Sequence, residues 1–167
     1  MRSDVVALNL QSGRVRWTKR QPALVHQMRV HRGRLVVAGE MRSFGAVERR
    51  NLAAIDLSTG RVKRFDPAVT GFGSNPFIYP FVRALAKRGR TLYVGGAFTE
   101  IRGVRRQNLA AVDAVTGRLR GDLPDVGGSA RGGRMALAAL PRGGLLAGGP
   151  FGSMELRATS GLARFRR

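Results

Sequence analysis

Residues 51–62 read NLAAIDLSTGRV, and residues 108–119 repeat them almost unchanged as NLAAVDAVTGRL. The match extends upstream with the same offset of 57 positions, because LVVAG at 35–39 corresponds to LYVGG at 92–96. Matches at several positions and at constant spacing indicate a repeat architecture, in which each unit buries its apolar faces against its neighbours. Two incomplete copies flank these units: DVVALNLQSGRV at 4–15 and LLAGGPF at 145–151.

Each repeat unit is predicted to consist of short β-strands. Apolar, β-prone runs such as TLYV at 91–94 recur about every 8–12 residues, with turn residues between them. No stretch keeps the i, i+3, i+4, i+7 apolar spacing of a helix for long. We expect strands at 5–10, 14–17, 25–31, 34–39, 51–56, 61–65, 81–87, 91–95, 108–113 and 118–121.

The turns of the repeat carry residues that have a structural explanation. Asp56 and Asp113 open Asp-x-x-Thr-Gly turns, in which the carboxylate can accept hydrogen bonds from the backbone N–H groups that follow it. The glycine that closes each turn takes a positive φ without steric cost. We therefore interpret one set of residues as structural turn positions rather than catalytic acids: Asn9, Gly13, Asp56, Gly60, Asp113 and Gly117.

The same turns carry a resemblance to a known family. The pattern Ala-x-Asn-x-x-Ser-Gly-x-x-x-Trp at 7–17 resembles the tryptophan-docking motif of quinoprotein-like (PQQ-like) propellers. Its first half returns at 54–60 and 111–117, but Arg64 and Gly121 stand where the motif has Trp. The stretch VGGAFT at 94–99, followed by Gly103 and NLA at 108–110, also resembles the bacterial delta-60 propeller repeat.

These resemblances imply an all-β fold of β-propeller blades, each with four antiparallel strands, in an incomplete arc of about three blades. The chain is expected to form a single partial propeller. Closed propellers usually have at least four blades, so we expect remaining blades or a second copy of the chain to close the ring. The blade assignment is the last two strands of a blade at 1–20, blades at 21–67 and 68–124, and a degenerate partial blade at 125–167.

The sequence offers no catalytic constellation. A quinone-dependent dehydrogenase would bring a calcium site, a catalytic Asp and often a vicinal cysteine pair, whereas this chain has no Cys and its ten acidic residues are scattered. His26 and His31 are five positions apart, so an extended strand would place them on opposite faces and not at one metal. We therefore expect no catalytic residue, no cofactor and no metal.

The expected function is that of a non-catalytic scaffold or ligand- or protein-binding module, within a longer exported bacterial-type protein. One alternative is the propeller portion of a quinoprotein-like enzyme, whose active site lies in blades outside this chain. The other alternative is a polyanion-binding module that uses arginine-rich loops. The partner would accordingly be a protein or an anionic polymer.

The charge leaves a choice open. Among 167 residues, 30 are basic and 10 acidic, a formal net charge of +20, and all basic residues except Lys19, Lys63 and Lys87 are arginines. Coding bias and a binding face for an anionic polymer both explain this excess. We expect no membrane span, because no apolar run approaches the roughly 18 residues of a membrane helix. The resemblance suggests a periplasmic or extracellular location, although no signal peptide is visible in the chain.

Candidate binding residues lie on loops that a propeller would gather on one face. These are the loops between second and third strands, 40–51 and 97–108, and the blade-to-blade loop 66–80. Aromatic rings interleaved with arginines could form a stacking and anion-holding surface there. Arginines also occur on the opposite face, at Arg32 and Arg34 for example. The candidate residues are Arg49, Arg50, Arg102, Arg105, Arg106, Phe72, Phe77 and Tyr79.

Overall fold

The chain forms an all-β structure, as the repeat predicts. The computed structural model describes residues 3–21, 24–71, 79–121, 123–127, 135–150, 153–154, 157–158 and 161–165. Within these ranges the regular elements are strands, and no helix occurs. Accordingly, the described residues contain no helix of the length and apolarity needed to cross a membrane. The candidate residues Phe72 and Phe77 lie outside the described residues.

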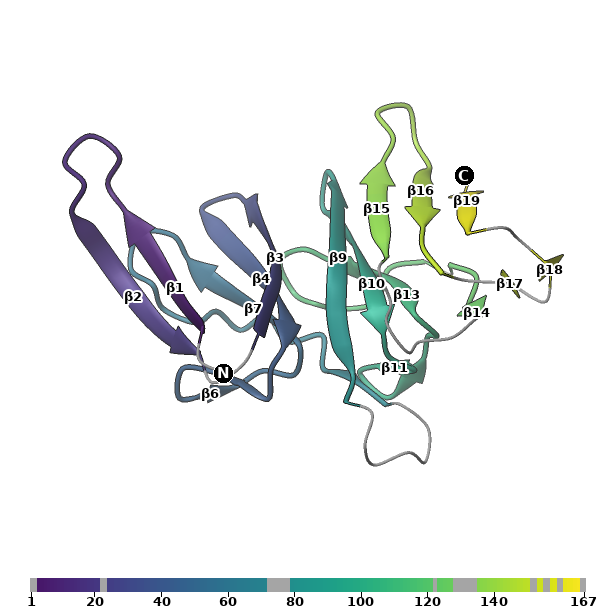
Figure 1. Ribbon diagram of the computed structural model, residues 1–167, viewed down its shortest axis with the longest axis horizontal. Helices are drawn as coiled ribbons and strands as arrows, with labels where there is room; N and C mark the ends of the chain where they lie inside the picture. Colours follow the sequence, from purple (N-terminus) through teal and green to yellow (C-terminus); the bar gives the residue numbers. More distant parts are fainter. Residues whose placement is uncertain are drawn as a thin grey trace.

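The longer strands form antiparallel sheets that follow one another along the chain (Figure 1). Each sheet is built from consecutive or nearly consecutive strands, which is the arrangement that a chain of repeat units produces. In chain order the sheets are β1 (Ser3–Leu8) with β2 (Val15–Gln21); β3 (Leu24–His31), β4 (Arg34–Glu40) and β7 (Leu52–Asp56); β9 (Phe81–Arg88), β10 (Thr91–Ala97) and β13 (Leu109–Asp113); and β15 (Ala136–Ala139), β16 (Leu145–Gly148) and β19 (Leu162–Phe165).

Short two-residue strands link each unit to the next. β8 (Val69–Thr70), in the segment that leaves one unit, pairs with β11 (Glu100–Ile101) in the loop between the second and third strands of the next unit. This pairing places the two kinds of predicted loop on one face of the structure. The other short strands are β5 (Ser43–Phe44), β6 (Val47–Glu48), β12 (Val104–Arg105), β14 (Val126–Gly127), β17 (Ser153–Met154) and β18 (Arg157–Ala158), and β14 pairs with β17 as β8 pairs with β11.

The predicted fourth strands at 61–65 and 118–121 form only in part, as short antiparallel contacts of two backbone hydrogen bonds each with the edges of their sheets. The structure shows only the isolated bridges Ile55↔Val62 and Val112↔Leu119 at these places, so these two sheets have three strands rather than four. In the first case the chain leaves the sheet edge to bury Phe65, and Pro67 then has no N–H to continue a ladder. In the second case the backbone turns away at Gly121, where φ is +66°.

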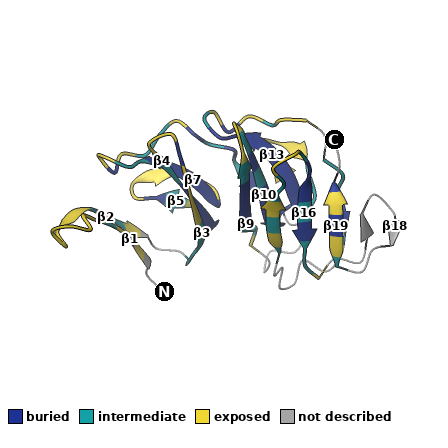
Figure 2. Cartoon of the chain, turned by 90° about the horizontal axis from the view of Figure 1, so that it is seen from above, coloured by how far each residue is buried: buried dark blue, intermediate teal, exposed yellow. Residues whose placement is uncertain are grey.

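Apolar cores fill the spaces between consecutive sheets. Strands β7 and β13 are buried along almost their whole length, as Figure 2 shows, because both faces of their sheets are covered. Successive side chains of a strand point to opposite faces. In β10, Leu92 and Val94 therefore pack towards the preceding sheet, while Tyr93 packs towards the following one. Phe98 is fully buried between the sheets of the two complete units.

The Asp-x-x-Thr-Gly turns have the hydrogen bonds that their residue types favour. Oδ1 of Asp113 accepts the N–H groups of Val115 at 3.0 Å and Thr116 at 2.9 Å. The turns at Asp56 and Asn9 repeat this pattern with the residues two and three positions ahead. The closing glycines have φ angles of +66° at Gly13, +67° at Gly60 and +74° at Gly117.

Trp17 connects the first sheet to the turn of the next unit. Its Nε1 donates to the Leu57 carbonyl at 2.9 Å, and its ring lies so close to Gly60 that a Cβ there would be 2.9 Å from Cγ of Trp17. At the next junction the backbone of Asp66 and Pro67 covers Gly117 instead. The two junctions therefore differ in what covers the closing glycine of the turn. Trp17 covers it in the first, whereas Arg64 stands at the equivalent position in the second and the backbone of residues 66–67 covers the glycine.

The ionisation of Asp113 predicts how stability depends on pH. Burial is the largest single influence and favours the protonated acid, but hydrogen bonds from Thr116, Val115 and Arg90 together outweigh it and lower the pKa to about 2. An unfolded Asp has a pKa of about 3.9. Because the folded-state pKa is the lower one, the carboxylate stabilises the fold fully above about pH 4, and this contribution is lost as pH falls towards 2.

We therefore expect Asp113→Asn to lower the free energy of unfolding at pH 7 by about 1–2 kcal/mol and to flatten its decrease between pH 4 and pH 2. The amide keeps an acceptor for the turn but loses the ion pair with Arg90, whose Nε lies 2.6 Å from Oδ2. Urea unfolding at a series of pH values measures both effects. Asp4→Asn, an exposed change in β1, is the control. Parallel pH profiles of Asp113→Asn and the unchanged chain would contradict the assignment.

Candidate functional site

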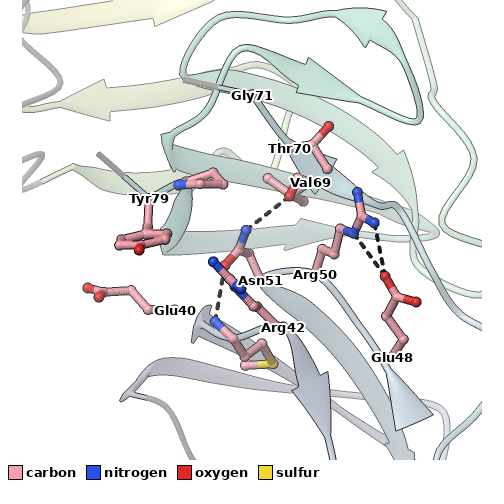
Figure 3. A pocket seen from close by; sticks show the side chains of 11 residues that line it. Glu40, Arg42, Glu48, Arg50, Asn51, Val69, Thr70, Gly71 and Tyr79 are labelled. Atoms are coloured by element: carbon pink, nitrogen blue, oxygen red, sulfur yellow. Dashed lines mark hydrogen bonds and ion pairs between the residues drawn. The ribbon is translucent and has the colours of Figure 1, made fainter. Parts of the chain in front are cut away.

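A pocket of about 620 Å³ lies on the loop face, where the two complete units meet. We call it the loop pocket. It is lined by residues 40–42, 48 and 50–51 of the first unit and by residues 69–71 and 79–80 at the start of the second. Figure 3 shows side chains from both units turned towards this space. The pocket therefore depends on the contact between two units and not on either unit alone.

Asn51 holds the wall of the loop pocket together. Its Oδ1 accepts the N–H of Met41 at 3.1 Å, and its Nδ2 donates to the carbonyl of Val69 at 3.0 Å (Figure 3). The side chain is buried, and the backbone has a φ of +64°, a conformation that Asn tolerates better than most residues. Asn108, one repeat later, has a φ of +62° and donates to Val126 in the same way.

An aromatic ring and four charged side chains surround the opening. The guanidinium carbon of Arg42 lies 5.3 Å from the centre of the Tyr79 ring, within the range of a cation–π contact. Arg50 pairs with Glu48 at 3.0 Å. Oε1 of Glu40 lies within hydrogen-bonding distance of Nε2 of His26, at 2.9 Å. Two arginines and two glutamates line the pocket, so their formal charges cancel.

The structure brings only part of the predicted set together. Arg50 and Tyr79 line the loop pocket. Arg49 instead donates to the carbonyls of Glu48 and Lys63, at 2.6 and 2.8 Å. Arg102 donates to the Asp66 carbonyl, Arg105 lies 3.6 Å from a carboxylate oxygen of Asp125, and Arg106 donates to the carbonyl of Arg105.

Sequence reasoning missed the acidic and amide members of the site. Glu40, Glu48 and Asn51 were not among the candidates, although they provide three of the seven polar side chains that line the pocket. The one available signal was the repetition of Asn51 at Asn108, which marks a position with a common structural task.

The two histidines lie in different surroundings. His26 contacts Glu40 at the loop face, whereas His31 is buried at the far end of the same strand. Burial, followed by the nearby charge of Lys87, lowers the pKa of His31, which keeps this ring neutral at pH 7. In the described part of the chain, no group of three or more His, Cys, Asp or Glu side chains is placed to hold a metal ion.

Comparisons with known proteins assign no family. No family model matches the chain, and no curated protein or solved structure matches it either. The resemblance to propeller repeats accordingly depends on the residues that recur within the chain.

Proposed function

We propose that this chain is a non-catalytic portion of a quinoprotein-like β-propeller that acts as a scaffold and a ligand-binding module. Support comes from three-stranded sheets that follow one another with apolar cores between them, and from turns that recur at each junction. The contact of Trp17 with the turn at Gly60 is the kind of docking that the resembling motif implies. We also propose that the protein is exported, as the resemblance to that family implies.

The loop pocket is the proposed binding site, and its ligand is a neutral polyhydroxylated molecule such as an oligosaccharide. The observation that carries this choice is the Tyr79 ring beside Arg42, at the mouth of a pocket whose charges cancel. A sugar ring can pack on an aromatic face, while carboxylates, guanidinium groups and amides exchange hydrogen bonds with its hydroxyls. A strongly anionic ligand would be attracted by the two arginines but repelled by Glu40 and Glu48.

The test is a screen of neutral oligosaccharides on a glycan array, followed by calorimetric titration of those that bind. Tyr79→Ala and Arg42→Ser are each expected to weaken binding at least tenfold, because they remove the ring or the group that orients it. Arg29→Ser is the matched control, since Arg29 is exposed on β3 and also loses one positive charge. Equal binding by Tyr79→Ala and the unchanged chain would overturn the assignment of the site.

Binding of a polyanion by the loop arginines is less well supported. Arg49 and Arg106 are occupied by backbone carbonyls, and Arg50 and Arg105 lie beside carboxylates. An anionic polymer would have to compete with these contacts. The loop pocket itself carries no formal net charge to attract one.

Partners that complete the ring remain part of the proposal. Val6, Leu8 and Val15 are exposed on the outer side of the β1–β2 hairpin, whereas Val5 faces the next sheet and is buried. A further blade, in the same polypeptide or in a second copy, would cover these apolar side chains. Such a cover would give the first sheet the same two-sided burial that β7 and β13 already have.

A further inference from the structure

A second pocket, of about 560 Å³, lies beside the turn that follows β13. We call it the basic pocket. Its lining consists of five cationic side chains and the turn residues 115–116. The cationic side chains are Arg34, Lys63, Arg64, Arg102 and Arg118, and they come from both complete units. Arg102 belongs to the predicted loop set, whereas Arg34 belongs to the arginines assigned to the opposite face.

The positive charge in the basic pocket is only partly neutralised. Among the residues that the structure describes, no carboxylate belongs to its lining. Lys63 pairs with Asp56 at 2.7 Å, but Arg34 and Arg102 donate to the carbonyls of Val115 and Asp66, which are neutral partners. These bonds position the two guanidinium groups without removing their charge. Like charges held together in this way repel one another unless an anion joins them.

Two of the five cations are available to a ligand. Arg64 and Arg118 are exposed, and neither has an ion-pair or hydrogen-bonding partner for its side chain among the residues that the structure describes. Each can therefore turn towards an anion without first breaking another contact. Guanidinium groups suit this task because their planar array of donors matches two oxygens of one phosphate or sulfate group.

The basic pocket arises where the repeat changes. Trp17 follows Gly13 by four positions, and Arg64 follows Gly60 by the same number. In the first junction Trp17 packs against Gly60 of the next turn. In the second junction the corresponding turn is covered by the backbone of residues 66–67, and Arg64 lies exposed at the pocket. The first junction is thus filled by the Trp17 ring, whereas the second has a pocket lined by cationic side chains at the equivalent place.

We propose that the basic pocket binds a small tetrahedral oxyanion, namely a phosphate or sulfate group, free or carried by a small molecule. The volume exceeds that of a single phosphate and falls within the range of small-molecule sites. The site is separate from the loop pocket, whose lining residues it does not share. Binding would also relieve the repulsion between the cations, and so would stabilise the folded chain.

The test is calorimetric titration with inorganic phosphate and with pyrophosphate at about 150 mM salt, where non-specific attraction is screened. Arg64→Ser/Arg118→Ser is expected to weaken pyrophosphate binding at least tenfold. Arg14→Ser/Arg29→Ser is the matched control, because it removes the same charge from exposed positions on β3 and in the β1–β2 loop. The control is expected to change the dissociation constant less than twofold. Equal weakening by both double variants would overturn the proposal in favour of general electrostatic attraction.

A second variant tests the role of Arg64 alone and leaves the other four cationic side chains of the basic pocket unchanged. Arg64→Trp introduces the residue of the first junction, and it is expected to weaken phosphate and pyrophosphate binding because it replaces one of the two unpaired cations with a bulky uncharged ring at the pocket. Retained binding by Arg64→Trp would contradict the site. Titration with a single-stranded oligonucleotide tests whether the chain binds an anionic polymer instead of a small anion. If it binds the unchanged chain while pyrophosphate fails to do so, a small-anion site is excluded.

Discussion

Phe98→Ala is expected to lower the free energy of unfolding by about 3–5 kcal/mol, the usual cost of truncating a fully buried phenylalanine. Phe98 is fully buried in the core that joins the sheet of β3, β4 and β7 to the sheet of β9, β10 and β13. Its loss leaves a cavity between two rigid sheets, which cannot close without moving one unit relative to the other. Urea unfolding followed by circular dichroism measures the effect.

The control for Phe98 is Leu10→Ala, because Leu10 is 97% exposed and its truncation is expected to cost less than about 0.5 kcal/mol. The single tryptophan, Trp17, provides a second signal from the first junction. If the units unfold as one cooperative array, Phe98→Ala lowers the urea midpoint measured by Trp17 fluorescence as much as the midpoint measured by circular dichroism. A lower midpoint in circular dichroism alone would show that the junctions unfold separately. Equal losses of stability in Phe98→Ala and Leu10→Ala would contradict the buried position of Phe98.

The repeat made most of the longer strands predictable, because an internal match marks equivalent positions without any knowledge of the fold. Strand β13 differs from the predicted 108–113 by one residue, and β4 by one at its end. The prediction failed where a single residue changes the path of the chain. Phe65 is more stable buried between sheets than paired at an edge, and the pattern of alternating residues does not distinguish these outcomes.

The candidate sites were predictable only at the level of loops. Arg49 and Arg50 are neighbours in sequence, but only Arg50 lines the loop pocket, since adjacent side chains point in different directions. Glu40 and Tyr79 line the same pocket because two units pack together, which no local pattern reveals. The basic pocket had one sequence signal, the Arg at position 64 where the first copy has Trp, but its other members come from distant segments.

Gly117→Val is expected to cost about 3–5 kcal/mol, more than the 1–3 kcal/mol of backbone strain alone. At φ +74° a β-branched residue is strained, and its Cβ would also lie 2.9 Å from the backbone nitrogen of Pro67. Gly103→Val separates these contributions, because Gly103 has a φ of +75° and nothing lies within 4 Å of its would-be Cβ. Thermal and urea unfolding of both variants should therefore show a larger loss at Gly117, and the difference measures the cost of the steric overlap between the new side chain and the backbone of residues 66–67. Equal losses at the two glycines would contradict the close packing of residues 66–67 on the turn at Gly117.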